Sequence, residues 1–282
     1  MSKRIKLVER FVDVLGFRGC YTDAGPRDGD VPVLLIVPSM LVRGLAYAPT
    51  IARLAPQFRV VTVELPGTGR SAKLDRVQDL DWYARWLAAF CDALGLRTVI
   101  PIGHSNSGAT VTLFARNYPD RVRALVLADS IGADRARSIP RVVFARGIDA
   151  ALELRLTLGG WHRVVYNALV HPRNFFTQIR LCVEIDITSV AAAVNAPALI
   201  GWGARDHTMP FPECPDILMR AFPAARLYVS SAGSHDWIVD LPDEFAAAVT
   251  RFLGVPRRAL DRVDTCEGSS RLGHLTIADK GR

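Results

Sequence analysis

The chain has 282 residues, half of them apolar, and carries a formal net charge of +7. This composition excludes a disordered or low-complexity protein, and the length is sufficient to bury the core of an α/β domain. No apolar run approaches the roughly 18 residues that cross a bilayer, so stable membrane insertion is not expected. The basic excess is dispersed over residues 1–10, 131–190 and 256–282, a pattern that does not favour nucleic-acid binding.

The cysteines bear on metal binding and on the cellular compartment. They are widely spaced at Cys20, Cys91, Cys182, Cys214 and Cys266. Because no Cys or His cluster has the spacing of a zinc site, we expect no metal, and free thiols in a reducing compartment. The start of the chain lacks the uninterrupted apolar segment of a signal peptide, so a cytoplasmic location is the expectation.

Two kinds of apolar pattern alternate along the chain. Residues 10–21 suit an antiparallel edge hairpin with a turn near Leu15-Gly16. Short β-branched runs predict strands at 33–37, 60–63, 99–102, 125–127, 198–200 and 227–229. Apolar residues at helical spacing predict helices at 80–94, 109–117 and 243–253. This alternation predicts an α/β fold with a mostly parallel, doubly wound sheet.

Residues 131–190 interrupt the alternation, being rich in arginine and aromatic residues and mostly helical in pattern. They are therefore predicted to be an insertion into a core formed by residues 1–130 and 191–255. The apolar periodicity stops after residue 255, and residues 256–282 are expected to form a mobile tail.

The strongest chemical signal is the segment Gly103-His104-Ser105-Asn106-Ser107-Gly108 between a predicted strand and a predicted helix. In this context a G-x-S-x-G motif presents the serine hydroxyl on a tight turn, above a helix N-terminus that favours negative charge. The alternative is a structural turn in which Ser105 caps the helix.

A serine nucleophile needs a general base and a group that orients the base. His235 follows the predicted strand at 227–229, and Asp206 follows the strand at 198–200. Because ligand-binding loops gather at the carboxyl ends of parallel strands, both are expected beside Ser105. Asp129, which follows the strand at 125–127, is the alternative acid.

Together these residues resemble the α/β-hydrolase fold family over residues 31–253, with the insertion standing where that family carries its cap. The segment Glu64-Leu65-Pro66-Gly67-Thr68-Gly69-Arg70-Ser71 is similar to a further loop of the family. The resemblance implies a nucleophile at Ser105, an acid at Asp206 and a base at His235. It also implies oxyanion-hole amides at Met40 and Asn106, and no cofactor.

The sequence departs from the family pattern in two places. Pro38-Ser39-Met40 stands where the family usually has His-Gly, and the missing glycine narrows the backbone geometry allowed there. Ser107 replaces a glycine of the motif, with little expected effect. The expected substrate contacts are Ser39, His104, Trp161, Tyr166 and Trp237.

The expected reaction is hydrolysis of an ester, thioester or amide bond of a small or medium-sized molecule through an acyl-Ser105 intermediate. Serine at position 105 excludes the carboxylate attack that the family's dehalogenases and epoxide hydrolases use. The alternative is a non-hydrolytic protein of the same fold, such as an acyltransferase, a lyase or cyclase, or a small-molecule receptor. Binding to a membrane surface or to nucleic acid through the basic tail is a third hypothesis.

Overall fold

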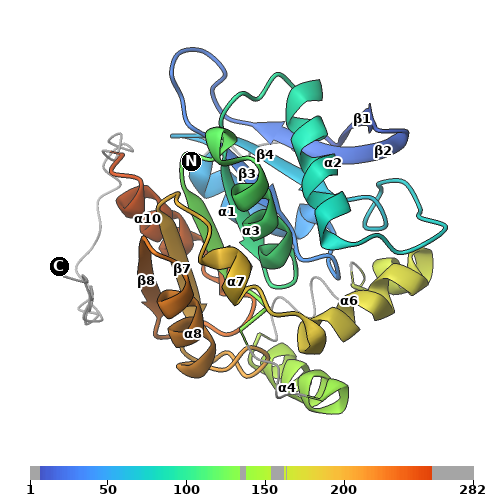
Figure 1. Cartoon of the computed structure of the whole chain (residues 1–282), viewed down its shortest axis with the longest axis vertical. Coiled ribbons are helices and arrows are strands. Elements are labelled where there is room, and N and C mark those ends of the chain that lie inside the picture. The colour runs from blue at the N-terminus through green and yellow to red at the C-terminus, as the bar shows by residue number, and fades with distance from the viewer. Residues whose placement is uncertain (1–6, 134–137, 154–161, 163, 256–282) are drawn as a thin grey trace, which may run out of the picture.

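The computed structural model describes residues 7–133, 138–153, 162 and 164–255. These residues form an eight-stranded sheet in the order β1-β2-β4-β3-β5-β6-β7-β8 (Figure 1). The β1–β2 and β2–β4 pairs are antiparallel, and all other neighbours are parallel. The strands are β1 Arg10–Val14, β2 Phe17–Ala24, β3 Val33–Val37, β4 Arg59–Glu64, β5 Ile100–His104, β6 Leu125–Ala128, β7 Ala198–Gly203 and β8 Ala225–Ser230.

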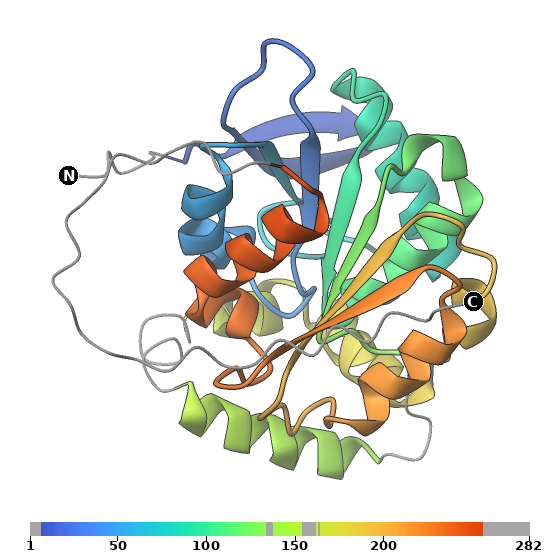
Figure 2. The same ribbon diagram turned by 90° about the vertical axis from the view of Figure 1, so that its left-hand side faces the viewer.

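Helices cover both faces of the sheet, with α1 and α10 on one face and α2, α3 and α8 on the other (Figure 2). The α-helices are α1 Ala48–Leu54, α2 Leu80–Ala93, α3 Ser107–Asn117, α4 Ile139–Leu152, α6 Pro172–Glu184, α7 Thr188–Ala191, α8 Glu213–Ala221, α9 Trp237–Asp240 and α10 Pro242–Phe252. The short 3-10 helices are η1 Gly44–Tyr47 and η2 Pro119–Arg121. The predicted mostly parallel, doubly wound sheet is confirmed.

The predicted edge hairpin is formed by β1 and β2. Its turn residues, Leu15 and Gly16, have φ angles of 49° and 79°. Positive φ at both central residues gives the turn a twist that matches the twist of paired strands. β2 then pairs with β4, which joins the hairpin to the parallel part of the sheet.

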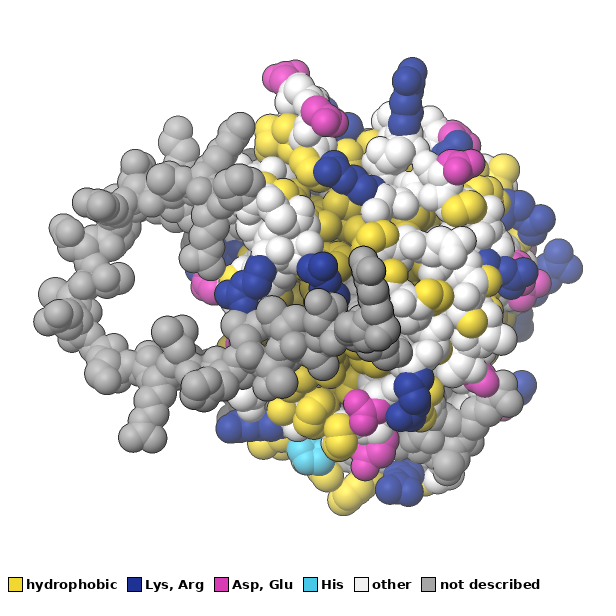
Figure 3. Space-filling view, turned by 60° about the vertical axis from the view of Figure 1, so that its left-hand side comes forward, with side chains coloured by type: hydrophobic (Ala, Val, Ile, Leu, Met, Phe, Trp, Pro, Cys, Tyr) yellow, Lys and Arg dark blue, Asp and Glu magenta, His cyan; other side chains and the backbone are white. Residues whose placement is uncertain are grey.

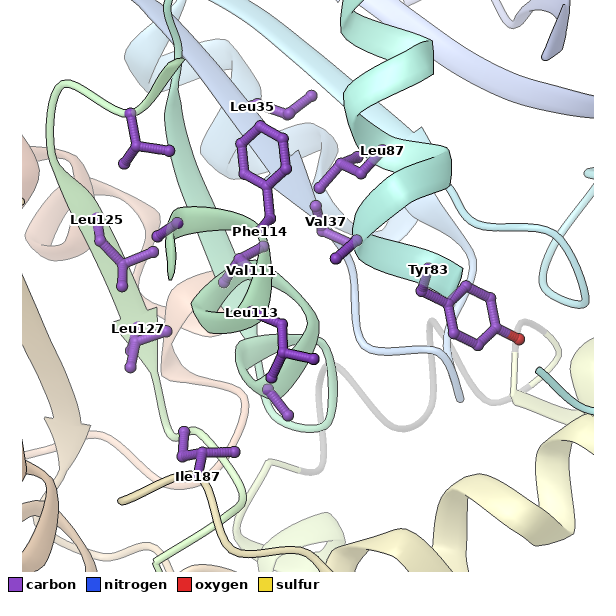
Figure 4. Close-up of a cluster of buried hydrophobic side chains, with 14 of the residues drawn as sticks. Leu35, Val37, Tyr83, Leu87, Val111, Leu113, Phe114, Leu125, Leu127 and Ile187 are labelled. Carbon is purple, nitrogen blue, oxygen red and sulfur yellow. The ribbon is translucent and has the colours of Figure 1, made fainter. Parts of the chain in front are cut away.

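The core explains why the central strands are continuous apolar runs. Along β3, Leu34 and Ile36 pack with α1 and α10, whereas Leu35 and Val37 pack against α2 and α3. Figure 4 shows the apolar side chains on the α2 and α3 side of the sheet, where Phe114 of α3 lies near Leu35. Strands buried on both faces require apolar side chains at every position.

The chain between β6 and β7 carries α4, a helix at residues 164–170 and α6, here called the β6–β7 helices. α4 and α6 lie beyond one end of the sheet (Figure 1). Their hydrogen bonds reach loops that follow four parallel strands, through the pairs Asn174–Gly67 after β4, Gln178–Asn106 after β5, Asp149–Thr208 after β7 and Arg146–Asp236 after β8. The β6–β7 helices therefore lie over the carboxyl ends of the parallel strands, next to the loops that carry Ser105, Asp206 and His235.

The surface of the described part adds two observations. None of its helices combines the length and the apolar composition that a membrane crossing requires. On the face shown in Figure 3, basic side chains are spread among apolar and acidic ones and do not gather into one patch. The predicted tail at residues 256–282 lies outside the described residues.

Candidate active site

Ser105 lies in the tight turn between β5 and α3, with a left-handed backbone φ of 55°. Its N–H donates to the Ala128 carbonyl at 2.9 Å, which fixes the turn against β6. The flanking positions must be small: a Cβ atom on Gly103 would lie 2.8 Å from the Gly108 Cα, and one on Gly108 would overlap the Ser130 hydroxyl. The close approach of strand and helix therefore needs the glycines of the motif.

The structure brings Ser105, His235 and Asp206 together at the carboxyl ends of β5, β8 and β7. The Ser105 Oγ lies 3.0 Å from His235 Nε2, and His235 Nδ1 lies 2.9 Å from Asp206 Oδ2. The other Asp206 oxygen accepts the Met209 N–H at 2.7 Å. All three residues are buried. With Nδ1 donating to Asp206, Nε2 is free to accept the hydroxyl proton of Ser105.

Asp129, the alternative acid, follows β6 and is fully buried, with a φ of 45°. Its Oδ1 accepts the Gly203 N–H at 2.9 Å. Its carboxyl group lies within 4.8 Å of ligand atoms of Asp206 and His235. Burial raises the pKa of Asp129 well above its usual range, and the nearby Asp206 raises it further. Asp129 is therefore harder to ionise than a free carboxyl group, whereas Asp206 makes the hydrogen bond to the imidazole.

Two clusters of the described residues have the composition of a metal site. In the first, Asp129, Asp206 and His235, both imidazole nitrogens are already used by Asp206 and Ser105. In the second, Glu9, Cys20 and Glu64, the carboxylates accept hydrogen bonds from arginine side chains and backbone amides. The protein's own groups thus engage the ligand atoms of both clusters, with the exception of Asp129 Oδ2.

The residues expected to form an oxyanion hole lie at the N-terminus of α3 and after β3. The Met40 N–H donates to the side-chain oxygen of Asn106 at 2.9 Å, and the Ser39 hydroxyl donates to the same oxygen at 3.3 Å. Asn106 precedes the first residue of α3, so its own N–H belongs to the unpaired amides of a helix N-terminus. The Met40 amide and the Asn106 residue are therefore adjacent to one another.

Several known proteins are similar to this chain in sequence or in fold. The sequence profile of a family described as "alpha/beta hydrolase fold" matches residues 32–146. A protein of Caulobacter sp. (strain K31), provisionally named as the carbamate hydrolase RutD, is 28% identical over 233 residues, covering 74% of this chain and 86% of that protein. A pimeloyl-acyl-carrier-protein methyl ester esterase of Aeromonas hydrophila is 23% identical, covering 81% of this chain and 98% of the esterase.

Solved structures show the same fold. The serine hydrolase CarC, described as involved in carbazole degradation, aligns with a TM-score of 0.74 at 23% identity, over 89% of this chain and 100% of that one. The profile match begins just before β3 and includes the Ser105 turn. The chain has the α/β-hydrolase fold, and its residues 32–146 match the family of that name. The predicted resemblance and the predicted fold class are thereby confirmed.

In this α/β-hydrolase-fold protein a buried chain of amide groups connects the Ser105 turn to α6. Asn106 Nδ2 donates to Gln178 Oε1 at 3.4 Å, and Gln178 Nε2 donates to Asn174 Oδ1 at 3.4 Å. Tyr83 also donates to Asn174, which in turn donates to the Gly67 carbonyl. The sequence patterns did not single out Asn174 and Gln178, although their spacing of four residues on a predicted helical stretch was a usable signal.

α4 of the α/β-hydrolase-fold protein turns its charged side towards the loops that carry His235 and Asp206. Arg146 pairs with Asp236, next to His235, and burial would raise the pKa of Asp236, but the guanidinium outweighs it and lowers that pKa to about 2. Asp149 accepts the Thr208 N–H at 2.8 Å and lies 2.9 Å from His207 Nδ1. The sequence patterns did not single out His207, which directly follows Asp206.

Two of the expected substrate contacts, His104 and Trp237, are buried against other groups of the α/β-hydrolase-fold protein. His104 is buried, and its ring nitrogens lie 2.5 Å from the Tyr47 hydroxyl and 3.0 Å from the His235 carbonyl. Trp237 is buried in the core, where its ring packs against Tyr228 and Phe245. These placements correct the expectation that the two residues line a substrate pocket.

The remaining expected contacts differ from one another in placement. Ser39 is buried beside Asn106. Tyr166 is half-buried, with the Arg43 guanidinium 5.0 Å from the centre of its ring. Trp161 lies outside the described residues. Ser39 therefore contacts the Ser105 turn through its hydrogen bond to Asn106.

Proposed function

We propose that this protein is a serine hydrolase that cleaves an ester or thioester bond of a small or medium-sized molecule through an acyl-Ser105 intermediate. The observation that carries the proposal is the continuous hydrogen-bonded chain from Ser105 Oγ through His235 to Asp206. The relatives named as a methyl ester esterase and a carbamate hydrolase support chemistry at a carbonyl group. The reaction requires no cofactor, and residues 131–190 act as a cap over the site.

In the proposed mechanism, His235 Nε2 accepts the Ser105 proton as the serine oxygen attacks the substrate carbonyl. The buried Asp206 holds the imidazole in the tautomer that leaves Nε2 unprotonated and stabilises the imidazolium that forms. The backbone amides of Met40 and Asn106 stabilise the oxyanion. His235 then protonates the leaving group, and water attacks the acyl-enzyme with His235 again as the base.

Labelling with a fluorophosphonate probe tests the proposal without a guess at the substrate. The expected result is one covalent adduct, mapped to Ser105 by peptide mass spectrometry, because an activated serine attacks the phosphorus centre. His235→Ala should lose the adduct while remaining folded. Absence of labelling in folded wild-type protein would contradict the proposed hydrolase.

A second candidate function keeps the fold and omits hydrolysis. The observation that favours it is that the Met40 N–H donates to the side-chain oxygen of Asn106. An acyltransferase, a lyase or cyclase, or a small-molecule receptor would then use the same site. Turnover of short activated esters separates the hydrolase from a receptor, because a receptor would not release the alcohol.

The activity is expected to depend on the protonation of His235. Burial by itself lowers the pKa of His235, but the adjacent Asp206 outweighs it and raises the pKa above the ordinary value of 6.5. Only neutral His235 accepts the Ser105 proton, so kcat/KM should be full at high pH and fall as the pH drops through that raised pKa. A pH profile with p-nitrophenyl acetate measures this. An acid limb with its midpoint below pH 6.5 would contradict the role of Asp206.

A further inference from the structure

The side chain of Asn106 occupies a position that the proposed reaction needs. The Met40 N–H, one of the two expected oxyanion donors, lies 2.9 Å from Asn106 Oδ1. The carbonyl oxygen that accepts from this amide therefore already stands where one hydrogen bond to a substrate oxyanion would form. The Ser39 hydroxyl donates to the same oxygen, so two donors of the β3 loop converge on it.

The carboxamide is also held from the other side. Its Nδ2 donates to Gln178 Oε1 on α6, and Asn106 and Gln178 are both almost completely buried. Because donors face the oxygen and an acceptor faces the nitrogen, the orientation of the amide follows from its partners. A substrate carbonyl can take the Met40 N–H only if the Asn106 oxygen leaves it.

We propose that Asn106 controls access to the oxyanion site: its side-chain oxygen occupies the Met40 amide until a substrate carbonyl displaces it, while its backbone N–H serves as the second donor. This inference rests on the proposed hydrolase function. Asn106 would thereby lower the reactivity of the empty site towards small electrophiles, and binding would have to replace the hydrogen bonds that the carboxamide gives up.

The test compares rates of fluorophosphonate labelling at Ser105. Asn106→Ala removes the carboxamide but keeps the backbone N–H, so the second-order rate constant should rise about tenfold, the equivalent of one or two hydrogen bonds. Asn106→Asp, of the same shape, places a charged acceptor against the Met40 amide and should slow labelling. The matched control is Asn117→Ala, an exposed asparagine at the other end of α3, which should label at the wild-type rate.

Equal or slower labelling of folded Asn106→Ala would overturn the inference while leaving the hydrolase function intact. If that variant does not fold, unchanged or faster labelling of Asn106→Asp overturns it instead. If neither wild-type protein nor any Asn106 variant forms an adduct at Ser105, the proposed function fails and the inference fails with it.

Discussion

Ser105→Ala is expected to lower kcat for an activated ester by about a million-fold, the scale of losing the nucleophile of a comparable triad. The hydroxyl is the group that attacks the carbonyl, and it donates to His235, which in turn donates to Asp206. Oxyanion stabilisation and substrate binding survive the change, so a slow rate above that of water should persist. Steady-state release of p-nitrophenol from p-nitrophenyl acetate measures the loss.

The control for this change is Ser138→Ala, an exposed serine at the start of α4 that makes no side-chain cap. It should retain wild-type kcat. Turnover of Ser105→Ala at the wild-type rate would show that another group is the nucleophile, and the assignment of the Ser105 turn as the active site would be abandoned.

Asp206→Asn is expected to lower kcat by about ten-thousand-fold with little change in structure. The carboxylate accepts the proton of His235 Nδ1, whereas an asparagine amide can donate to that nitrogen and stabilise the wrong tautomer. The imidazolium would also lose its counter-charge. Kinetics on the same ester, with the folded state checked by circular dichroism, measure the effect.

Asp129→Asn provides the matched comparison, because it removes the other buried carboxyl group beside the triad. A carboxyl group and a carboxamide have similar shape, and the hydrogen bond from the Gly203 amide can be retained. We therefore expect a far smaller loss of kcat than for Asp206→Asn. A larger loss in Asp129→Asn would assign the orienting role to Asp129.

Most of the sheet was predictable because buried parallel strands are continuous apolar runs, as in β3. α1 and α8 were not predicted. α1 has seven residues, too few for a helical period to stand out, and carries Pro49 in its first turn. α8 contains Pro215, which suggests a break although proline is tolerated in the first turn of a helix.

The triad residues were predictable because each ends a parallel strand, and such ends share one edge of the sheet. Gln178 and Asn174 were not, since which side of α6 faces Ser105 depends on packing between segments far apart in the chain. Trp237 was misplaced because its position two residues after His235 does not show where α9 begins. The contact between Met40 and Asn106 depends on a side-chain rotamer, which no sequence pattern encodes.

At Ser105 the left-handed backbone conformation lowers the stability of the folded protein, whereas the proposed activity requires the serine side chain there. A residue with a Cβ atom in that conformation costs about 1–2 kcal/mol, which glycine would largely avoid, apart from its greater freedom in the unfolded chain. Selection for stability alone would therefore favour glycine there, and a glycine cannot carry a nucleophile. Serine is thus retained at a position whose backbone conformation favours glycine. Screens that select for thermostability alone would tend to replace it.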